Sequence, residues 1–283
     1  MLPSGCFYIG KSKTVVRRFA QHLAAHEKIL GFSFIPTKIS RLDATERDLI
    51  FRAQALGLVL TNSTHVAHIV GETDLDLVVP PDQQERWLKE NTTVSNDFNQ
   101  GKIVLDESHL ACFSRQYTRF MASDYHDAVV CLLRKYISSC IIAPDLTEYA
   151  FWSLSCMPST SAGTRIAVVN AGMMELLVIG LLEGRGGPLS AFINVSEAIL
   201  SKNDALVNFM ISDGIGFTYP LYRDSGNDCC QVYFLVEDHD WIFKDPTFRA
   251  AAADLSLRIM RKRPTIFSKY HCKQLADEVL SGV

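Results

Sequence analysis

The stretch Tyr8-Ile9-Gly10-Lys11-Ser12 decides how the first part of this chain is expected to fold. The short apolar run Cys6–Gly10 predicts a strand. Lys11–Lys13 lead out of this strand. A helix is predicted next, because Thr14 can serve as its N-cap and apolar side chains recur every four residues at Val15, Phe19 and Leu23. The predicted order is a strand followed at once by an amphipathic helix.

Two polar residues of this helix, Arg18 and His22, are four positions apart and therefore share a face. Each of them precedes a residue of the apolar stripe by one position, so this face borders the stripe. Side chains at the border of core and solvent can line a cleft. An arginine there can contact a phosphate through two hydrogen bonds and stabilise charge on its oxygens. A histidine beside it can donate to the phosphate or move a proton near neutral pH. A solvated amphipathic helix fits the same pattern.

A second helix is predicted from Asp43 to Gly57, after a proline-containing edge strand over Phe32–Ser40. Its apolar face consists of Leu49, Ile50, Ala53 and Leu56. Glu46 permits two interpretations. It has the spacing of a capping box with Asp43, in which its carboxylate bonds the cap amide. It also stands one turn before the apolar face, where an inward carboxylate can anchor one Mg²⁺ ion.

The chain after this point is predicted to form a second and larger domain. A strand over Leu58–Thr61 and the turn residue Asn62 complete the first module, which we place at residues 1–75. Residues 76–104 are expected to connect it to residues 105–283, where hairpins and helices predict an α+β fold. Helices are predicted over Asp124–Ser138, Asp145–Cys156, Pro246–Met260 and Lys273–Leu280, and strands over Arg165–Val169, Met173–Ile179, Leu189–Val195, Gly216–Tyr222 and Gln231–Val236.

The composition is that of an ordinary globular protein rather than a disordered chain. Of 283 residues, 48% are hydrophobic and 21% are charged, and the formal net charge is −3. No apolar run is long enough to cross a bilayer, so no membrane attachment is expected. The eight cysteines include no Cys-x-x-Cys pair, which favours buried free thiols and a cytoplasmic location.

Positive charge is concentrated at the start of the chain. Residues 1–60 contain nine Lys or Arg and four Asp or Glu, whereas residues 61–110 contain three and nine. Phosphate contacts supply most nonspecific affinity for nucleic acids, so a basic first module suits a polyanion. Small basic modules also occur without nucleic acid, and the charge distribution alone leaves both interpretations open.

The order and spacing of these residues resemble the GIY-YIG endonuclease family. The resemblance rests on Tyr8-Ile9-Gly10, an arginine eight residues after the glycine, a histidine four later, the block Glu46-Arg47-Asp48-Leu49-Ile50 and a late asparagine. It covers about residues 5–65, and nothing after roughly Val70 contributes to it. It implies a small α/β nuclease module that hydrolyses phosphodiester bonds in DNA with the help of one Mg²⁺ (or Mn²⁺) ion.

The resemblance also implies a role for each matching position. Tyr8 corresponds to a tyrosine close to the attacking water, Arg18 to the catalytic arginine, and His22 to a position often occupied by histidine in restriction enzymes. Glu46 corresponds to the carboxylate that holds the metal ion. The other matched or adjacent residues are expected to contact substrate or support the site: Gly10, Lys11, Lys13, Arg17 and Asn62.

One element of the family pattern is missing. The Gly-Ile-Tyr strand that normally precedes the Tyr-Ile-Gly strand has no counterpart, because only seven residues precede Tyr8. Gly5-Cys6-Phe7 abuts Tyr8 and leaves no room for a turn. Three explanations stay open: a strand upstream of Met1, a strand from another segment of the chain, or a module that no longer cuts.

The predicted function is therefore a metal-dependent DNA endonuclease, with a role in restriction, phage defence or a mobile element. The second domain would supply target recognition, homodimer or partner-subunit contacts, or control. The alternative is a nucleic-acid-binding or regulatory protein that keeps a nuclease-like lobe without activity. Cleavage of DNA in the presence of Mg²⁺ separates the two predictions.

Overall fold

The computed structural model describes residues 5–25, 29–90, 111, 113–159, 164–182 and 187–281. The chain divides into two compact units. Unit 1 comprises residues 1–72 together with 221–227, and unit 2 comprises residues 73–220 together with 228–283. Helices and an antiparallel sheet are both present, so the fold is α+β, as the sequence predicted.

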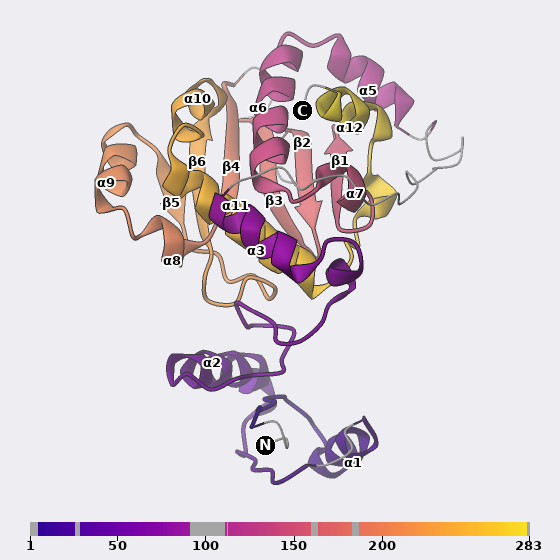
Figure 1. Ribbon diagram of the computed structural model, residues 1–283, viewed down its shortest axis with the longest axis vertical. Helices are drawn as coiled ribbons and strands as arrows, with labels where there is room; N and C mark the ends of the chain where they lie inside the picture. The colour runs from indigo at the N-terminus through magenta and orange to yellow at the C-terminus, as the bar shows by residue number, and fades with distance from the viewer. Residues whose placement is uncertain are drawn as a thin grey trace. The chain divides into compact units, whose positions relative to one another are not determined.

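The described part of unit 1 contains helices and a minimal pairing of extended segments (Figure 1). Its helices are α1 (Val15–Ala25) and α2 (Leu42–Ala55), with the 3₁₀ turn η1 (Ile39–Arg41) before α2. The extended segments meet at one parallel bridge between Phe7 and Leu60. The strands predicted over Cys6–Gly10 and Leu58–Thr61 are reduced to this bridge, because no further strand pairs with either segment among the described residues.

The core of unit 1 is small and lies under α2. Its hydrophobic cluster consists of the buried residues Ile50, Ala53, Leu60 and Val66, and Phe7, Ile9, Phe51 and Ile69 pack against them. Leu56, which the sequence placed on the same apolar face, is 77% exposed. The predicted helix is therefore present, but only its middle contributes to the core.

Two sequence predictions for unit 1 are wrong. Val15 and Leu23 of α1, expected on a buried face, are 40% and 50% exposed. The ring of Phe19 makes the aromatic contact of this face, 4.3 Å from that of Phe32. The edge strand predicted over Phe32–Ser40 contains no strand residues and runs into η1, since it has no strand neighbour in the part of the chain that the structure describes.

Unit 2 is built on a six-stranded antiparallel sheet with the order β1-β2-β3-β4-β6-β5. Its strands are β1 (Trp152–Cys156), β2 (Thr164–Ala171), β3 (Met174–Leu181), β4 (Leu189–Val195), β5 (Gly216–Thr218) and β6 (Cys230–Leu235). The predicted hairpin between β2 and β3 is confirmed. Gly172 occupies its turn with a φ of 51°, a left-handed conformation that glycine adopts at little cost.

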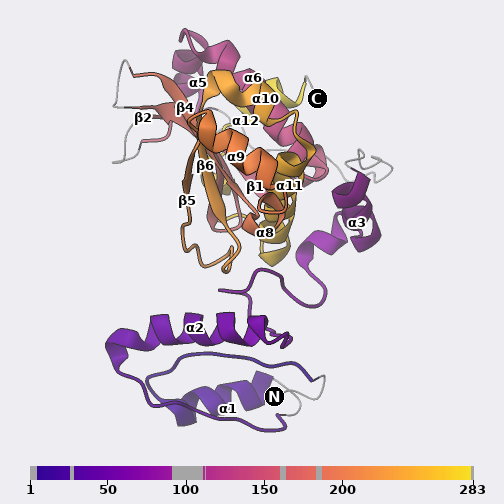
Figure 2. The same ribbon diagram turned by 90° about the vertical axis from the view of Figure 1, so that its left-hand side faces the viewer.

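The helices α6, α11 and α12 gather on one face of this sheet (Figures 1 and 2). α11 (Pro246–Lys262) packs on β4 and β2, α12 (Lys273–Leu280) packs on β1, and α6 (His126–Cys140) packs on both helices. α11 begins where its sequence predicts, because Asp245 accepts hydrogen bonds from the N–H groups of Thr247 and Phe248. Within the described ranges, the other helical segments of unit 2 are η2 (Asp74–Leu77), α3 (Pro81–Glu90), α5 (Ser114–Met121), α7 (Pro144–Thr147), α8 (Glu197–Leu200), α9 (Asp204–Ser212), η3 (Val236–Asp238), α10 (His239–Ile242) and η4 (Ser268–Tyr270).

The prediction of a helix over Asp145–Cys156 is wrong. The helix lasts for one turn, α7, and the chain then turns at Tyr149, where φ is 66°, before it enters β1. All five residues of β1 are buried, although Trp152, Leu154 and Cys156 alternate with two serines in its sequence. This alternation is a strand signal, but it extends over only five residues, and the predicted helix continues across it. The strand predicted over Gly216–Tyr222 is likewise limited to β5.

The segment predicted to connect the two domains, residues 76–104, is partly folded. It includes α3, which packs on α11 in unit 2. The amide of Gln84 in α3 is buried and donates to Val79 O at 2.7 Å. The division between the units falls between Glu72 and Thr73. Residues 91–104 of the predicted connection lie outside the described ranges.

Candidate active site

Tyr8 is contacted by both polar residues of α1 that the sequence singled out. Arg18 Nη2 donates a hydrogen bond to the Tyr8 phenol oxygen at 3.1 Å. The His22 ring centroid lies 4.7 Å from that of Tyr8, at an interplanar angle of 51°. Residues four apart on a helix are neighbours on its surface, which is how both side chains reach one phenol.

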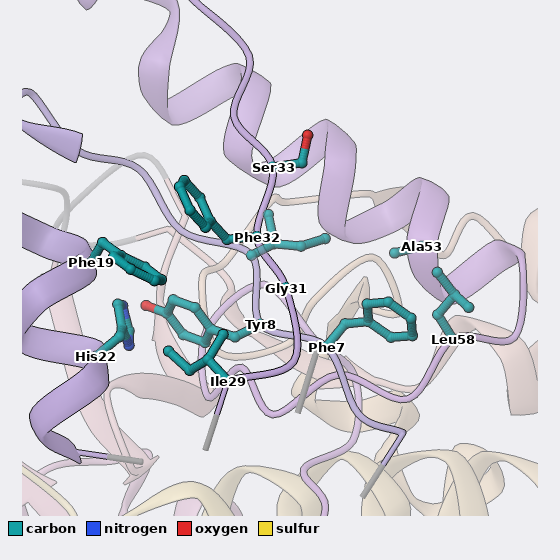
Figure 3. Close-up of a pocket in the computed structure, with 11 residues that line it drawn as sticks. Phe7, Tyr8, Phe19, His22, Ile29, Gly31, Phe32, Ser33, Ala53 and Leu58 are labelled. Carbon is teal, nitrogen blue, oxygen red and sulfur yellow. The ribbon is translucent and has the colours of Figure 1, made fainter. Parts of the chain in front are cut away.

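Tyr8 borders a cavity of about 560 Å³ whose lining is mostly apolar (Figure 3). Tyr8 and His22 lie side by side at this cavity, and Phe19 of α1 lies next to them (Figure 3). The apolar lining includes Phe7, Phe19, Ile29, Phe32 and Leu58. The phenol thus has an apolar environment around its ring and a cation at its hydroxyl group.

Gly10 lies directly against the Tyr8 side chain. A Cβ atom at this position would be 2.7 Å from Tyr8 Cε1 and 3.1 Å from the phenol oxygen. The first distance is well inside van der Waals contact, so any larger residue would displace the ring. The glycine therefore allows the phenol to fold back over the following backbone and to meet Arg18.

Lys11 joins this segment to the start of α2 through two carboxylates. Its Nζ lies 3.0 Å from Oε2 of Glu46 and forms an ion pair with Asp43. Its backbone N–H donates to Oε1 of Glu46 at 3.1 Å. Asp43 and then Glu46 raise the pKa of Lys11, and the ammonium lowers the pKa of Asp43. One lysine therefore contacts both carboxylate oxygens of Glu46, whose side chain is only 13% exposed.

The capping-box interpretation of Glu46 is wrong. α2 begins at Leu42, and Arg41 occupies the N-cap position without a side-chain capping bond. Glu46 is bonded to Lys11 instead. Its carboxylate is therefore directed toward the segment that carries Tyr8 and not toward the start of its own helix.

These groups line one further cavity, of about 370 Å³. Tyr8, Arg18, His22, Lys11 and Glu46 all contribute to its lining, as does Gly10. They come from three parts of unit 1, the extended segment and the helices α1 and α2. The volume lies within the range of small-ligand sites. We therefore treat this cavity as the candidate active site.

Asn62 holds the Tyr8 segment in place, although it lies 53 residues after Ile9 in the sequence. Its buried side chain accepts a hydrogen bond from the Ile9 N–H at 3.0 Å, through Oδ1, and donates to Ile9 O at 2.6 Å, through Nδ2. The two bonds satisfy the backbone groups that a neighbouring strand would otherwise satisfy. Asn62 thus fixes the backbone between Tyr8 and Gly10.

Two other predicted substrate contacts, Lys13 and Arg17, are not brought to this cavity. Both are exposed, and neither is among the described residues that line the two cavities around Tyr8. Arg17 is about 100° round the helix from Arg18, which occupies the position beside the phenol.

His65 and Arg223 are two further residues of unit 1 that the sequence did not single out. His65 is buried with a φ of 62°, and its N–H donates to Arg223 O at 2.6 Å. Burial lowers the pKa of His65, and the charge of Glu46 opposes that shift. A positive φ leaves no pattern in the neighbouring residues, and Arg223 is far away in the sequence.

Asp43 and Glu46 direct their carboxylates at one point, which the Lys11 ammonium occupies. Among the described residues, no group of three His, Cys, Asp or Glu side chains is placed to hold a metal ion. The donor set nevertheless suits Mg²⁺, which prefers oxygen ligands and keeps several waters. Glu46 would hold the ion, with Asp43 beside it, and the ammonium of Lys11 would have to move aside.

No protein-family profile, no characterised protein and no solved structure matches this chain. The helices of the described ranges include none with the length and apolar content to cross a bilayer. The assignment of a function to the cavity in unit 1 therefore depends on its geometry and on the chemistry of its side chains.

Proposed function

We propose that this protein is a metal-dependent endonuclease that hydrolyses phosphodiester bonds in DNA. The observation that carries the proposal is the convergence of Tyr8, Arg18, His22 and Glu46 on one cavity of about 370 Å³. A phenol, a guanidinium, an imidazole and a carboxylate are groups that position water, move protons, stabilise phosphate charge and bind Mg²⁺. No two of these four lie next to each other in the sequence.

Arg18 would bind the scissile phosphate. One of its N–H groups donates to Tyr8, and a guanidinium has five such donors in a planar fork. When water attacks phosphorus, negative charge builds up on the non-bridging oxygens, and a cation already fixed beside them stabilises it without reorganisation. The hydrogen bond to Tyr8 holds the guanidinium in that position.

Tyr8 and His22 would position or activate the attacking water. The phenol oxygen accepts from Arg18, so the phenol hydrogen is directed to another partner. The His22 imidazole lies beside the phenol, and an imidazole in its neutral form can accept a proton. In the proposed step, the water oxygen bonds to phosphorus, the bond between phosphorus and the leaving sugar oxygen breaks, the neutral imidazole of His22 takes the proton of the water, and the leaving oxygen takes a proton from solvent.

Glu46 would hold one Mg²⁺ or Mn²⁺ ion, which supplies Lewis-acid stabilisation of the phosphate when it is bound. The carboxylate is largely shielded from solvent and is oriented by the Lys11 N–H. Gly10 and Asn62 would act indirectly, since they fix the Tyr8 ring and the backbone beside it.

Cleavage of supercoiled plasmid in the presence of Mg²⁺ tests the proposal. Glu46→Gln and Arg18→Gln should each lower the nicking rate by about a hundredfold or more, the range seen when a charge-stabilising group is removed. Asp48→Asn serves as the control, because it removes an exposed carboxylate from the same helix. Equal cleavage by all four proteins would show that this cavity is not the active site.

The rival function is a DNA-binding or regulatory protein without nuclease activity. One observation favours it: Lys11 contacts both oxygens of Glu46, so a metal ion must compete with an ammonium group. Wild-type protein that binds DNA but leaves plasmid intact over a wide range of Mg²⁺ and Mn²⁺ concentrations would support the rival.

A further inference from the structure

A short segment from far along the chain is part of unit 1. Residues 221–227 lie between β5 and β6 in the sequence, but their contacts place them with residues 1–72. The His65 N–H donates to Arg223 O at 2.6 Å. Ser225 and Gly226 are buried. The segment is therefore an integral piece of the unit that holds the candidate active site.

Residues 221–227 pack closely against the backbone of Val66 and Ala67. Gly226 has a φ of 69°, and a Cβ atom at this position would lie 2.6 Å from Ala67 N and 2.6 Å from the Val66 carbonyl carbon. Both neighbours are backbone atoms, which cannot swing away as a side chain can. The backbone of residues 221–227 thus packs directly on the backbone that follows Asn62, and this packing determines where Arg223 is held.

The Arg223 side chain is available for binding and belongs to the unit that holds the candidate site. It is exposed, and in the part of the chain that the structure describes its guanidinium has no hydrogen bond or ion pair. Its backbone lies near that site, because Arg223 O is bonded by His65, three residues after the Asn62 that bonds the Ile9 backbone. Lys11 is the largest cause of the lowered pKa of Asp43 and burial that of His65, and the charge of Arg223 adds to both shifts. By contrast, Arg18 donates to Tyr8, and Lys11 is paired with two carboxylates.

We propose that Arg223 binds a backbone phosphate of the DNA substrate next to the site of cleavage. This inference rests on the proposed nuclease function. An exposed guanidinium without a partner gives up no internal interaction when it binds a phosphate, and it can do so through two hydrogen bonds. A backbone contact of this kind positions the duplex and carries no sequence information. The residue is a substrate-binding group, and Arg18 remains the contact to the scissile phosphate.

Fluorescence anisotropy with a labelled DNA duplex and the full-length chain tests Arg223. Measurements in Ca²⁺ or without metal keep the duplex intact. Arg223→Gln should weaken binding by about five- to tenfold near 0.1 M salt and lower the slope of log Kd against log salt by about one, the effect of one lost phosphate contact. Arg223→Lys should retain most of the salt dependence.

Arg52→Gln is the matched control. Arg52 is also exposed, belongs to unit 1 and lies in the last turn of α2, ~13 Å along that helix from Asp43. We expect its loss to change binding by less than about twofold, and both variants to keep the wild-type circular dichroism spectrum.

Two results would overturn the inference, and they are distinguishable. If wild type binds and cuts DNA while Arg223→Gln and Arg52→Gln have the same Kd and the same salt slope, Arg223 makes no phosphate contact and the nuclease function stands. If wild type neither binds nor cuts DNA, the proposed function fails and the inference fails with it.

Discussion

The Lys11 ammonium lies 3.0 Å from Oε2 of Glu46, while the backbone N–H of the same lysine donates to Oε1 at 3.1 Å. One residue therefore neutralises and orients the carboxylate that would hold a metal ion. Asp43, one turn earlier on α2, contacts the same ammonium. The lysine occupies the place of a cation, and any divalent ion at Glu46 competes with it.

Replacing Lys11 by Met should increase the affinity of the site for divalent cations. Removal of one positive charge about 3 Å from Glu46 is worth at least about 1 kcal/mol even in a water-like dielectric, which corresponds to roughly a fivefold to tenfold lower Kd. Isothermal titration with Mn²⁺ measures it without reference to cleavage. Lys13→Met, which removes an exposed lysine two positions later, should leave the Kd unchanged. A Kd that rises in Lys11→Met would mean that the ammonium organises the metal site.

Gly10→Ala should lower the cleavage rate by about tenfold or more without unfolding the protein. The added Cβ would be 2.7 Å from Tyr8 Cε1, so the ring must move and its hydrogen bond from Arg18 must break. Gly31→Ala is the matched control, because a Cβ at Gly31 meets nothing within 4 Å. A Gly10→Ala variant that cuts plasmid as fast as Gly31→Ala would show that the position of the phenol does not matter for the reaction.

Asn62→Ala should loosen the Tyr8 segment by about 1–3 kcal/mol, the cost of leaving buried polar groups without partners. The Ile9 N–H and C=O both lose their hydrogen bonds in this variant. Hydrogen exchange at the Ile9 amide measures the effect directly and should become about tenfold faster or more. Asn62→Asp keeps an acceptor for the Ile9 N–H and should protect this amide better than Asn62→Ala does. Equal, wild-type protection in both variants would contradict the role assigned to Asn62.

Unit 1 should lose stability as the pH falls below about 6.5, the ordinary pKa of histidine. Burial lowers the pKa of His65 in the folded state, so the unfolded chain binds a proton more readily. Stability is therefore complete above that pH and declines below it until the lowered folded-state pKa is reached. His65→Asn should remove this part of the decline, because Asn does not titrate and tolerates a positive φ.

Hydrogen-exchange protection factors of peptides from residues 50–70, compared at pH 7.5 and pH 5, test the pH effect. Tryptophan fluorescence would not report on it, since Trp87, Trp152 and Trp241 all belong to unit 2. Wild type should lose more protection than His65→Asn at the lower pH. An equal loss in both proteins would assign the acid sensitivity to another group.

Several elements could be predicted because their signal lies within a few residues. β4 and α12 have the bounds that their sequences predicted, and α11 begins after its aspartate cap. The meeting of Arg18 and His22 at one phenol also follows from a spacing of four on a helix. β1 was missed although its apolar residues alternate with serines, because this signal extends over only five residues directly after the start of a predicted helix.

By itself, the sequence determined the α+β class, the helices on which the candidate residues lie, and the residue types available for phosphate chemistry. Only the tertiary structure decided that Glu46 bonds to Lys11 and does not cap its own helix, that α1 exposes its apolar stripe, and that Arg223 joins unit 1. The physical reason is the separation along the sequence over which each interaction acts. Helical periodicity and capping act over about four residues. Ion pairs, burial and backbone packing depend on segments that only the folded chain brings together.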